Sequence, residues 1–430
     1  MINRIIDIIK DKNILILGFG REGKTTYNFI REYLPNKKVT ILDENSVTLG
    51  DDNTEVIITN ITHDILKNYD LIFKSPGISL KNIDTADLNI TSQLELLLEV
   101  NRKNVIGVTG TKGKSTTSSL IYSVIKNFKD NTYLLGNIGT PIFEMIDNFD
   151  DDTTLVIECS SHQLEFIKTS PHIGIILNLH PEHLDHYRSL NDYYNAKLNM
   201  FKYQNINDYI LYDDSIKDYI YADSIKIDIN KDIFIKDGNV YIKKGNVDVL
   251  VYDTNSKRKL LGDHNLNNIL FVLMIVDILG YDIKKSVEII NNFEPLEHRM
   301  EYVGKYNGID FYNDSIATIP DATINCVNAI KGVDTLILGG NDRGLDYTDL
   351  IQFVNNSNLE NIICLPKTAH DYMDKLTKKT YKVESLEEAV KIAKKVTKHV
   401  CVLSPAASSY GYFKNFEERG KLFKELVRKD

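Results

Sequence analysis

A glycine-rich turn between an apolar strand and a helix constrains the fold of this chain more than any other feature. The turn lies in VIGVTGTKGKSTT, residues 105–117. Gly110 and Gly113 lack a Cβ, so backbone N–H groups can close around phosphate oxygens, and the following helix adds the positive end of its dipole. Lys114 offers positive charge to the β- and γ-phosphates, and Ser115 offers a hydroxyl to Mg²⁺. The turn therefore predicts a nucleotide-binding α/β domain.

Strand-like apolar runs alternate with helix-like stretches along most of the chain, which indicates parallel sheets with crossover helices. Three groups of such runs begin near residues 13, 105 and 309. The region 201–259 differs, because its apolar residues come in short alternating pieces typical of an antiparallel excursion. We therefore predict an α/β fold with three domains: a Rossmann-like domain at 1–98, a central P-loop ATPase-like parallel sheet with a small antiparallel excursion at 99–297, and a Rossmann-like domain at 298–430.

Composition excludes several classes of protein. The 51 basic and 60 acidic residues give a net charge of −9, opposite to that of most nucleic-acid-binding proteins. The longest apolar run, Ile269–Val276, is far shorter than the ~18–20 residues that cross a bilayer, and the N-terminus lacks a secretory signal pattern. The four cysteines are scattered without a CxxC pair, as free thiols in a reducing compartment are. We expect a cytoplasmic protein without a nucleic-acid or membrane partner.

Two further clusters follow predicted strands. Glu158 ends the run 155–158, and ligands of open α/β sheets bind at such strand ends, where a carboxylate is a hard ligand for Mg²⁺. The segment 178–186 carries three histidines and two acids, which could suggest zinc, but the spacing does not match a closed zinc site and no cysteine joins it. We favour a Mg²⁺-related role for His183. Lys197 lies on an amphipathic helix, where a lysine is ordinarily a solvated surface charge.

Together these segments resemble the Mur ligase family, the ATP-dependent amide-forming enzymes of peptidoglycan precursor synthesis. The resemblance rests on TGTKGKSTT, LVIECSSHQLE, EHLDHY, YNAKLNMF, GDHNLNN and HRME, in that order along the chain. It implies that ATP and two Mg²⁺ ions bind and that Lys197 carries a carbamate. The implied nucleotide-binding residues are Gly110, Thr111, Lys112, Gly113, Lys114, Ser115, Thr116, Asn265, Asn268, Arg299 and Asp314. The implied metal ligands are Ser115, Glu158, His183 and Lys197, and the implied catalytic residues are Lys114, His183, Lys197 and Arg299.

Within the family, the chain resembles the branch that adds glutamate. This resemblance rests on SPGI at 75–78, GNIG at 136–139 and LSPAASSYGYFKNFEERG at 403–420. It implies that the carboxylate of UDP-N-acetylmuramoyl-L-alanine takes the γ-phosphoryl group of ATP, and that the glutamate amine then attacks the acyl phosphate. The implied substrate-binding residues are Gly18, Arg21, Ser75, Pro76, Gly77, Asn137, Gly139, Ser160, Gln163, Arg343, Ser409 and Phe416. We expect a monomer whose partners are these small-molecule substrates.

The chain departs from the family pattern at several positions. Ile316 replaces a usual lysine near the nucleotide phosphates, Ile319 an asparagine, Gly411 an aspartate and Lys112 an asparagine. Some of these variants also resemble the branch that adds L-glutamate, so both enantiomers stay open, with D-glutamate favoured.

One alternative comes from a different class of enzyme. The GxGxxG at 18–23 follows a predicted strand, and Asp43 lies 20 residues after Gly23, a pattern typical of dinucleotide-binding oxidoreductases that use NAD. The second glycine loop at 110–115 has no place in such an enzyme, and the first loop would instead hold the UDP group. A regulatory UDP-sugar-binding module is a further alternative, which the retained Lys114, Glu158 and His183 argue against.

Overall fold

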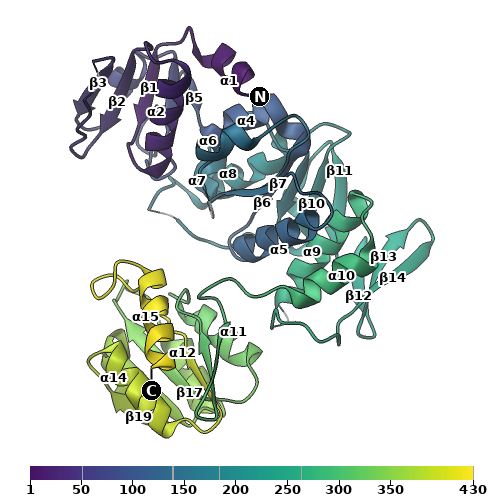
Figure 1. Cartoon of the computed structure of the whole chain (residues 1–430), viewed down its shortest axis with the longest axis vertical. Helices are drawn as coiled ribbons and strands as arrows, with labels where there is room; N and C mark the ends of the chain where they lie inside the picture. Colours follow the sequence, from purple (N-terminus) through teal and green to yellow (C-terminus); the bar gives the residue numbers. More distant parts are fainter. Residues whose placement is uncertain (51, 138–139, 184, 263, 430) are drawn as a thin grey trace. The chain divides into compact units, whose positions relative to one another are not determined.

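The structure is a computed structural model that describes residues 1–50, 52–137, 140–183, 185–262 and 264–429. Its contacts divide the chain into two compact units (Figure 1), with unit 1 formed by Met1–Ser256 and Asn267–Ile290, and unit 2 by Lys257–Leu266 and Asn291–Asp430. Helices alternate with mostly parallel strands in both units, which confirms the predicted α/β class. Unit 1 contains two sheets and unit 2 contains one.

The first sheet of unit 1 has five parallel strands in the order β3-β2-β1-β4-β5. Residues of β1 alternate between two cores, with Ile14 and Ile16 in one and Leu15 and Leu17 in the other. Burial on both faces is typical of a parallel sheet and explains the uninterrupted apolar run. The elements are α1 (Ile2–Ile9), β1 (Ile14–Leu17), α2 (Arg21–Tyr33), β2 (Val39–Asp43), β3 (Thr54–Ile58), α3 (His63–Leu66), β4 (Leu71–Lys74), β5 (Ile90–Thr91) and α4 (Gln93–Asn101).

The second sheet of unit 1 has the strand order β14-β13-β12-β11-β10-β9-β6-β8-β7. Strand β6 lies between its parallel neighbours β8 and β9, so the carboxyl ends of all three meet at one edge. The antiparallel excursion is confirmed as β12–β14, whose β13–β14 hairpin ends the sheet in Figure 1. The strands are β6 (Val105–Thr109), β7 (Thr132–Gly136), β8 (Thr154–Glu158), β9 (Ile173–Ile176), β10 (Tyr209–Asp213), β11 (Ile225–Ile229), β12 (Ile233–Lys236), β13 (Asn239–Lys244) and β14 (Val247–Asp253). The helices are α5 (Lys114–Lys126), α6 (Ile142–Met145), α7 (Ser161–Leu164), α8 (Leu190–Lys202), α9 (His264–Ile278) and α10 (Ile283–Asn292), with 3₁₀ segments at Arg102–Asn104, Ile146–Asn148 and Asp214–Tyr219.

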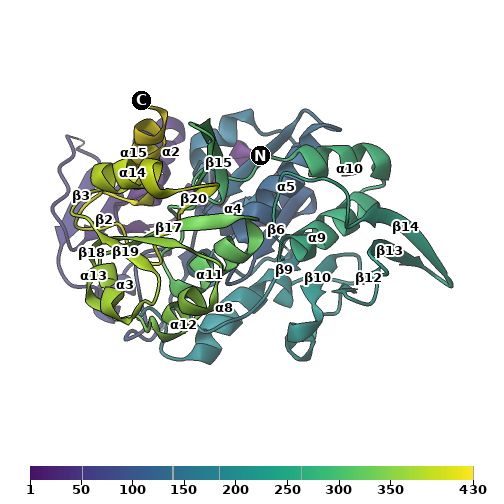
Figure 2. The same cartoon turned by 90° about the horizontal axis from the view of Figure 1, so that it is seen from below.

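The sheet of unit 2 has the order β15-β16-β20-β17-β18-β19, with only its β15–β16 pair antiparallel. Leu336 and Leu338 of β17 face a core with α11–α13, whereas Ile337 faces a core with α14 and α15 (Figure 2). The chain runs from β17 outward to β19 and then returns to β20 on the other side of β17, so the strand order reverses between β17 and β20. The elements are β15 (Glu301–Tyr306), β16 (Ile309–Asn313), α11 (Pro320–Ala329), β17 (Val333–Gly340), α12 (Thr348–Asn356), β18 (Asn361–Lys367), α13 (Thr368–Tyr372), a 3₁₀ turn at Met373–Lys375, β19 (Lys379–Lys382), α14 (Leu386–Val396), β20 (Val400–Leu403) and α15 (Phe416–Arg428).

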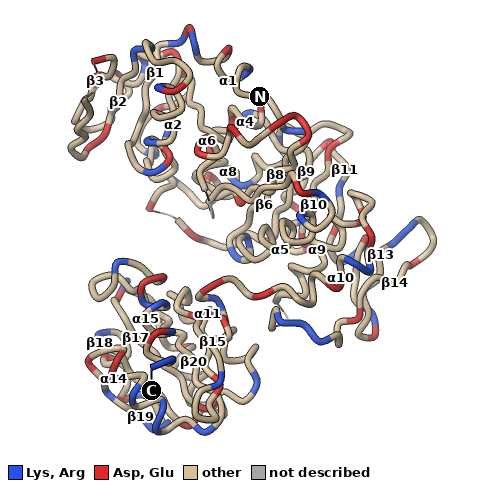
Figure 3. The backbone as a smooth tube through the Cα atoms, in the orientation of Figure 1, with Lys and Arg blue, Asp and Glu red and all other residues tan. Residues whose placement is uncertain are grey.

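Surface chemistry agrees with the composition. Basic and acidic residues are interspersed along both units (Figure 3). Within the described part of the chain, no helix is long and apolar enough to cross a membrane, and the run Ile269–Val276 is buried in α9. All four cysteines are free thiols and are buried.

Candidate active site

The glycine-rich turn joins β6 to α5. Gly110 has φ +148° and Gly113, the N-cap of α5, has φ +88°, a backbone region that a side chain disfavours. A Cβ on Gly113 would also lie 3.0 Å from Oδ1 of the buried Asn268. Ser115 and Thr116 follow in the first turn of the helix. The amide groups at the start of α5 can therefore donate hydrogen bonds to an anion such as a phosphate group.

Side chains from neighbouring strands hold the turn in shape. Asn178, just after β9, accepts through Oδ1 from the amides of Thr111 (3.1 Å) and Lys112 (2.8 Å) and donates to the carbonyl of Lys112 (3.0 Å). The hydroxyl of Tyr193 lies 3.1 Å from that of Thr111. Sequence analysis did not single out either residue, although Asn178 is the first polar residue after a buried strand.

Two lysines converge on the carboxyl end of β6. The Lys114 ammonium donates to the carbonyl oxygens of Gly110 and Thr111, both at 2.9 Å. Lys197 of α8 donates to the same Gly110 oxygen at 2.9 Å. Lys197 is only 2% exposed, so the structure replaces the ordinary expectation of a solvated lysine with a buried one. Burial and the nearby Lys114 lower the pKa of Lys197 to about 7.

Glu158 lies at the predicted strand end and is 1% exposed. Its Oε1 accepts from Nδ2 of Asn137 at 2.8 Å, whereas its buried Oε2 has no hydrogen-bond partner. An orphaned carboxylate oxygen beside a phosphate loop fits a divalent cation, which would supply the missing partner. Ser115 and Glu158 therefore suit Mg²⁺ by donor type.

His183 lies on the segment after β9, in a left-handed conformation with φ +56°. Its ring centroid is 5.9 Å from that of Tyr193 and 4.8 Å from that of His162. Burial lowers the pKa of His183, and the charges of Lys197 and Lys114 also lower it, so the imidazole is favoured in its neutral, metal-binding form. The described part of this segment forms no compact donor group of the zinc type.

A cleft of about 460 Å³ in unit 1 gathers residues from both of its sheets. Seven of the predicted substrate-binding residues line it: Gly18, Arg21, Ser75, Pro76, Gly77, Asn137 and Gln163. Ser160 is not in the lining but caps α7 reciprocally with Gln163. Gly139 lies outside the described residues.

Three acidic residues also line this cleft: Glu22, Asp43 and Glu44. The sequence analysis named only Asp43 among them, as part of the dinucleotide-binding pattern. Asp43 accepts from the amide of Phe19 at 2.7 Å, so it supports the first glycine loop. Burial raises the pKa of Glu22 to about 7. The position of Asp43 beside the first glycine loop is indicated by its spacing in the sequence, whereas the burial of Glu22 depends on contacts between segments far apart in the chain.

Most of the remaining predicted residues belong to unit 2, several of them just after its strands. Arg343 is exposed after β17, Ser409 is buried after β20, and Phe416 begins α15. Asp314 follows β16, and its carboxylate accepts from Ser404 Oγ (2.7 Å) and the Met300 amide (3.2 Å).

Burial raises the pKa of Asp314 to about 6, with Arg299 close enough to oppose the shift. Asn265 belongs to unit 2, where it donates to the Leu261 carbonyl at 2.6 Å, whereas Asn268 belongs to unit 1. These two predicted nucleotide-binding asparagines both lie on α9, on either side of the boundary between the units.

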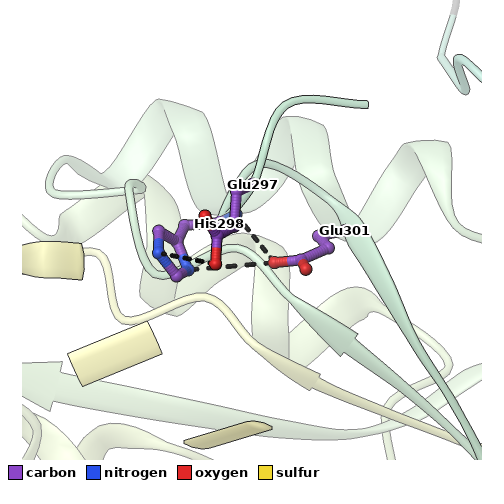
Figure 4. Close-up of side chains that lie close together, drawn as sticks. All are labelled: Glu297, His298 and Glu301. Carbon is purple, nitrogen blue, oxygen red and sulfur yellow. Dashed lines mark hydrogen bonds and ion pairs between the residues drawn. The ribbon is translucent and has the colours of Figure 1, made fainter. Parts of the chain in front are cut away.

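Glu297, His298 and Glu301 form a second compact group of possible metal ligands (Figure 4). Lys424 already donates to both carboxylates, at 2.5 Å to Glu297 and 2.8 Å to Glu301. The His298 ring accepts through Nδ1 from Nδ2 of Asn313 at 2.8 Å. Because Lys424 already occupies the place that a metal ion would take between the two carboxylates, this group is an ion-pair cluster. It holds the segment that carries Arg299.

Comparison with known proteins agrees with this arrangement. Residues 108–276 match the Mur ligase middle domain. The chain is 31% identical, over 452 aligned positions, to the UDP-N-acetylmuramoylalanine–D-glutamate ligase of Thermoanaerobacter sp. (strain X514), covering 97% of this chain and 98% of the relative. Its fold is similar to that of the MurF ligase of Thermotoga maritima in complex with ADP (TM-score 0.58, 16% identity, 97% and 96% coverage) and of MurF from Acinetobacter baumannii (TM-score 0.62, 14% identity, 96% and 90% coverage). At these sequence identities, the two structures support the fold and nothing further.

Proposed function

The chain belongs to the Mur ligase family, and from this premise we propose that it joins D-glutamate to UDP-N-acetylmuramoyl-L-alanine at the expense of ATP. The relative named above carries this activity in its name and matches the chain almost end to end. The observation that carries the proposal is the geometry of unit 1, in which the phosphate loop follows β6, the cleft includes Gly136 and Asn137 at the end of β7, and Glu158 ends β8 between these two strands. The oxidoreductase alternative is disfavoured, since the first glycine loop lines that cleft beside residues of the second sheet.

The phosphate loop would perform the activation step. A carboxylate oxygen of the substrate attacks the γ-phosphorus, the bond to the β-phosphate oxygen breaks, and ADP leaves. Two anions must approach each other, so positive charge is needed where charge moves, and Lys114, whose ammonium donates to two carbonyl oxygens of the loop, would supply it. The glutamate amine then attacks the acyl carbon, loses a proton, and phosphate departs.

The metal-binding residues would be Ser115 and Glu158 for one Mg²⁺ and His183 with Lys197 for a second. When bound, these ions would neutralise phosphate charge and align the γ-phosphoryl group. Lys197 would join only as a carbamate, formed when its neutral amine attacks CO₂ and releases a proton. A lowered pKa supports this step, because a neutral amine is the reactive form.

The amino acid would bind in unit 2, where Arg343, Ser409 and Phe416 lie at the reversal of strand order, the place where α/β sheets commonly bind ligands. Asp314 would contact the nucleotide ribose, and Arg299 the moving phosphoryl charge. A guanidinium suits a glutamate carboxylate because it can donate two parallel hydrogen bonds.

The test is incubation with ATP, Mg²⁺, UDP-N-acetylmuramoyl-L-alanine and each glutamate enantiomer separately. We expect phosphate release and a product heavier by one glutamate residue with D-glutamate. Product with L-glutamate alone would assign the chain to the other branch, and neither product nor phosphate with either enantiomer would refute the proposal. Lys197→Ala should lose activity and regain part of it with added short carboxylates, which could replace the carbamate oxygens.

A further inference from the structure

A partly buried carboxylate, Glu165, joins three segments of unit 1. Its Oε2 lies 3.2 Å from Nζ of Lys74 and 3.2 Å from Nε2 of His186. The side chains of these partners are 3% and 7% exposed, and that of Glu165 is 17% exposed. Burial alone would raise the pKa of Glu165, but the hydrogen bond from His186 and the charge of Lys74 outweigh it and lower the pKa. The carboxylate is therefore held ionised between its two partners.

Each of the three segments adjoins a part of the proposed site. Lys74 ends β4 and directly precedes Ser75, Pro76 and Gly77, which line the substrate cleft. Glu165 follows α7, the helix whose Gln163 lines the same cleft.

The third residue, His186, adjoins the proposed metal ligand His183. Its amide, and that of Tyr187, donate to the carbonyl of His183 at 3.0 and 3.2 Å. The ring centroid of His162 lies 4.1 Å from that of His186 and 4.8 Å from that of His183. A displacement of His186 would therefore be transmitted to His183 through both backbone and rings.

Side chains that follow the substrate loop hold the same segment. Ser79 Oγ donates to the carbonyl of His186 at 2.7 Å, and Lys81 donates to the carbonyl of Asp185. In the opposite direction, Arg188 donates to the carbonyl of Ile83 at 2.8 Å. The Glu165 cluster thus lies within a wider set of contacts between the first sheet and the His183 segment.

We propose that Lys74, Glu165 and His186 are positioning residues that fix the His183 segment relative to the substrate loop Ser75–Gly77. The same contacts would then set the positions of both the metal ligand and the loop that binds the UDP-sugar substrate. None of the three contacts the reacting atoms in this account. The inference rests on the proposed function for the identity of the substrate, but its metal-binding part can be measured without turnover.

A purely structural role is the competing explanation, and the chain offers a matched control for it. Asp208 is a carboxylate that also joins a cation and a histidine, Arg102 and His172; its side chain is 3% exposed, and those of its partners are 23% and 32% exposed. These residues precede β10, β6 and β9, so they lie at the opposite edge of the same sheet from the phosphate loop. Asp208→Asn should therefore affect stability without affecting the site.

The experiment compares Glu165→Gln, Lys74→Met, Lys74→Arg and Asp208→Asn with the wild type. Mn²⁺ binding is measured by electron paramagnetic resonance in the presence of a non-hydrolysable ATP analogue, and folding by circular dichroism. We expect Glu165→Gln and Lys74→Met to weaken Mn²⁺ binding about tenfold, the lower end of losses seen when supports of metal ligands are removed. In turnover assays, the KM for the UDP-sugar substrate should rise while the KM for glutamate stays unchanged. Lys74→Arg should recover most of the Mn²⁺ affinity because it retains the cation.

Two results would overturn the inference. One is wild-type Mn²⁺ affinity in a folded Glu165→Gln or Lys74→Met protein. The other is an equal loss in Asp208→Asn, which would show that any destabilisation of the sheet has this effect. Should Glu165→Gln not fold, the Lys74 pair decides the question. Failure of the proposed function would be visible separately, as a wild-type protein that binds Mn²⁺ normally but forms no glutamate adduct.

Discussion

The proposed role of Lys197 can be tested through the pH dependence of the free energy of unfolding, because its amine changes protonation on folding. The perturbation is Lys197→Met, which keeps a long side chain and removes the amine. Burial and the nearby Lys114 lower the pKa from 10.5 to about 7 in the folded chain, whereas the unfolded chain keeps the ordinary value. A pKa lower by roughly 3.5 corresponds to at most about 5 kcal/mol. At about pH 7.5, roughly three quarters of the folded amine would be neutral, against about 0.1% at the ordinary pKa.

The sign of the pH dependence follows from proton linkage. Below pH 7 the amine is charged in both states, and the folded state bears the whole cost of burying that charge. Between about pH 7 and 10.5 only the unfolded state keeps the proton, so the free energy of unfolding rises with pH. Relative to Lys197→Met, wild-type stability should increase by about 1.4 kcal/mol per pH unit in the middle of this window, and by about half as much per unit near pH 7.

The assay is urea unfolding in CO₂-free buffer between about pH 6.5 and 9, a range that includes the folded pKa and the region above it. Tyrosine fluorescence is a suitable signal, since the chain has 24 tyrosines and no tryptophan. Lys202→Met, an exposed lysine on the same helix, is the control and should follow the wild-type curve. Parallel curves for wild type and Lys197→Met would refute the reasoning and remove the physical basis for a carbamate at this position.

Three further substitutions test the remaining parts of the site. Lys114→Ala should lower ligation by about 100-fold or more while circular dichroism stays unchanged, and near-normal phosphate release would exclude the loop as the ATP site. Gly113→Ala should destabilise the fold by about 1–2 kcal/mol and weaken ATP binding, because φ at this position is +88° and Asn268 lies close to the added Cβ. The control is Gly245→Ala, where φ is +62° and the space around the glycine is open. This control should lower stability without changing ATP binding. Arg343→Ala should raise the KM for glutamate about tenfold or more, with the KM for ATP unchanged, and an unchanged glutamate KM would remove Arg343 from the amino-acid site.

The sequence was sufficient for those parts of the molecule that depend on local pattern. Apolar runs such as 13–18 became buried parallel strands, and the alternating stretch 239–251 became an antiparallel hairpin. Glycine loops and strand-end polar residues indicated which edge of each sheet would carry the site. These predictions succeed because strand periodicity and glycine conformations are properties of short segments.

Other parts of the site depend on long-range contacts and could not be read from sequence. Lys74 and Glu165 are ordinary surface residue types, and only their burial against each other makes them an ion pair. Lys197 was expected to be solvated by residue type, yet α8 packs that face against the end of β6. Asn178 supports the phosphate loop from 66 residues away, a distance that carries no local signal.

Burial of all four cysteines has a practical consequence for following the enzyme at work. Desolvation raises the pKa of Cys159, Cys326, Cys364 and Cys401, so these thiols are both shielded and protonated in the folded chain. A single reporter cysteine introduced at exposed Lys244 of unit 1, and another at exposed Lys391 of unit 2, would then be the reactive pair for maleimide dyes. Fluorescence transfer between such dyes would record the separation of the two units through a catalytic cycle without removing any native thiol.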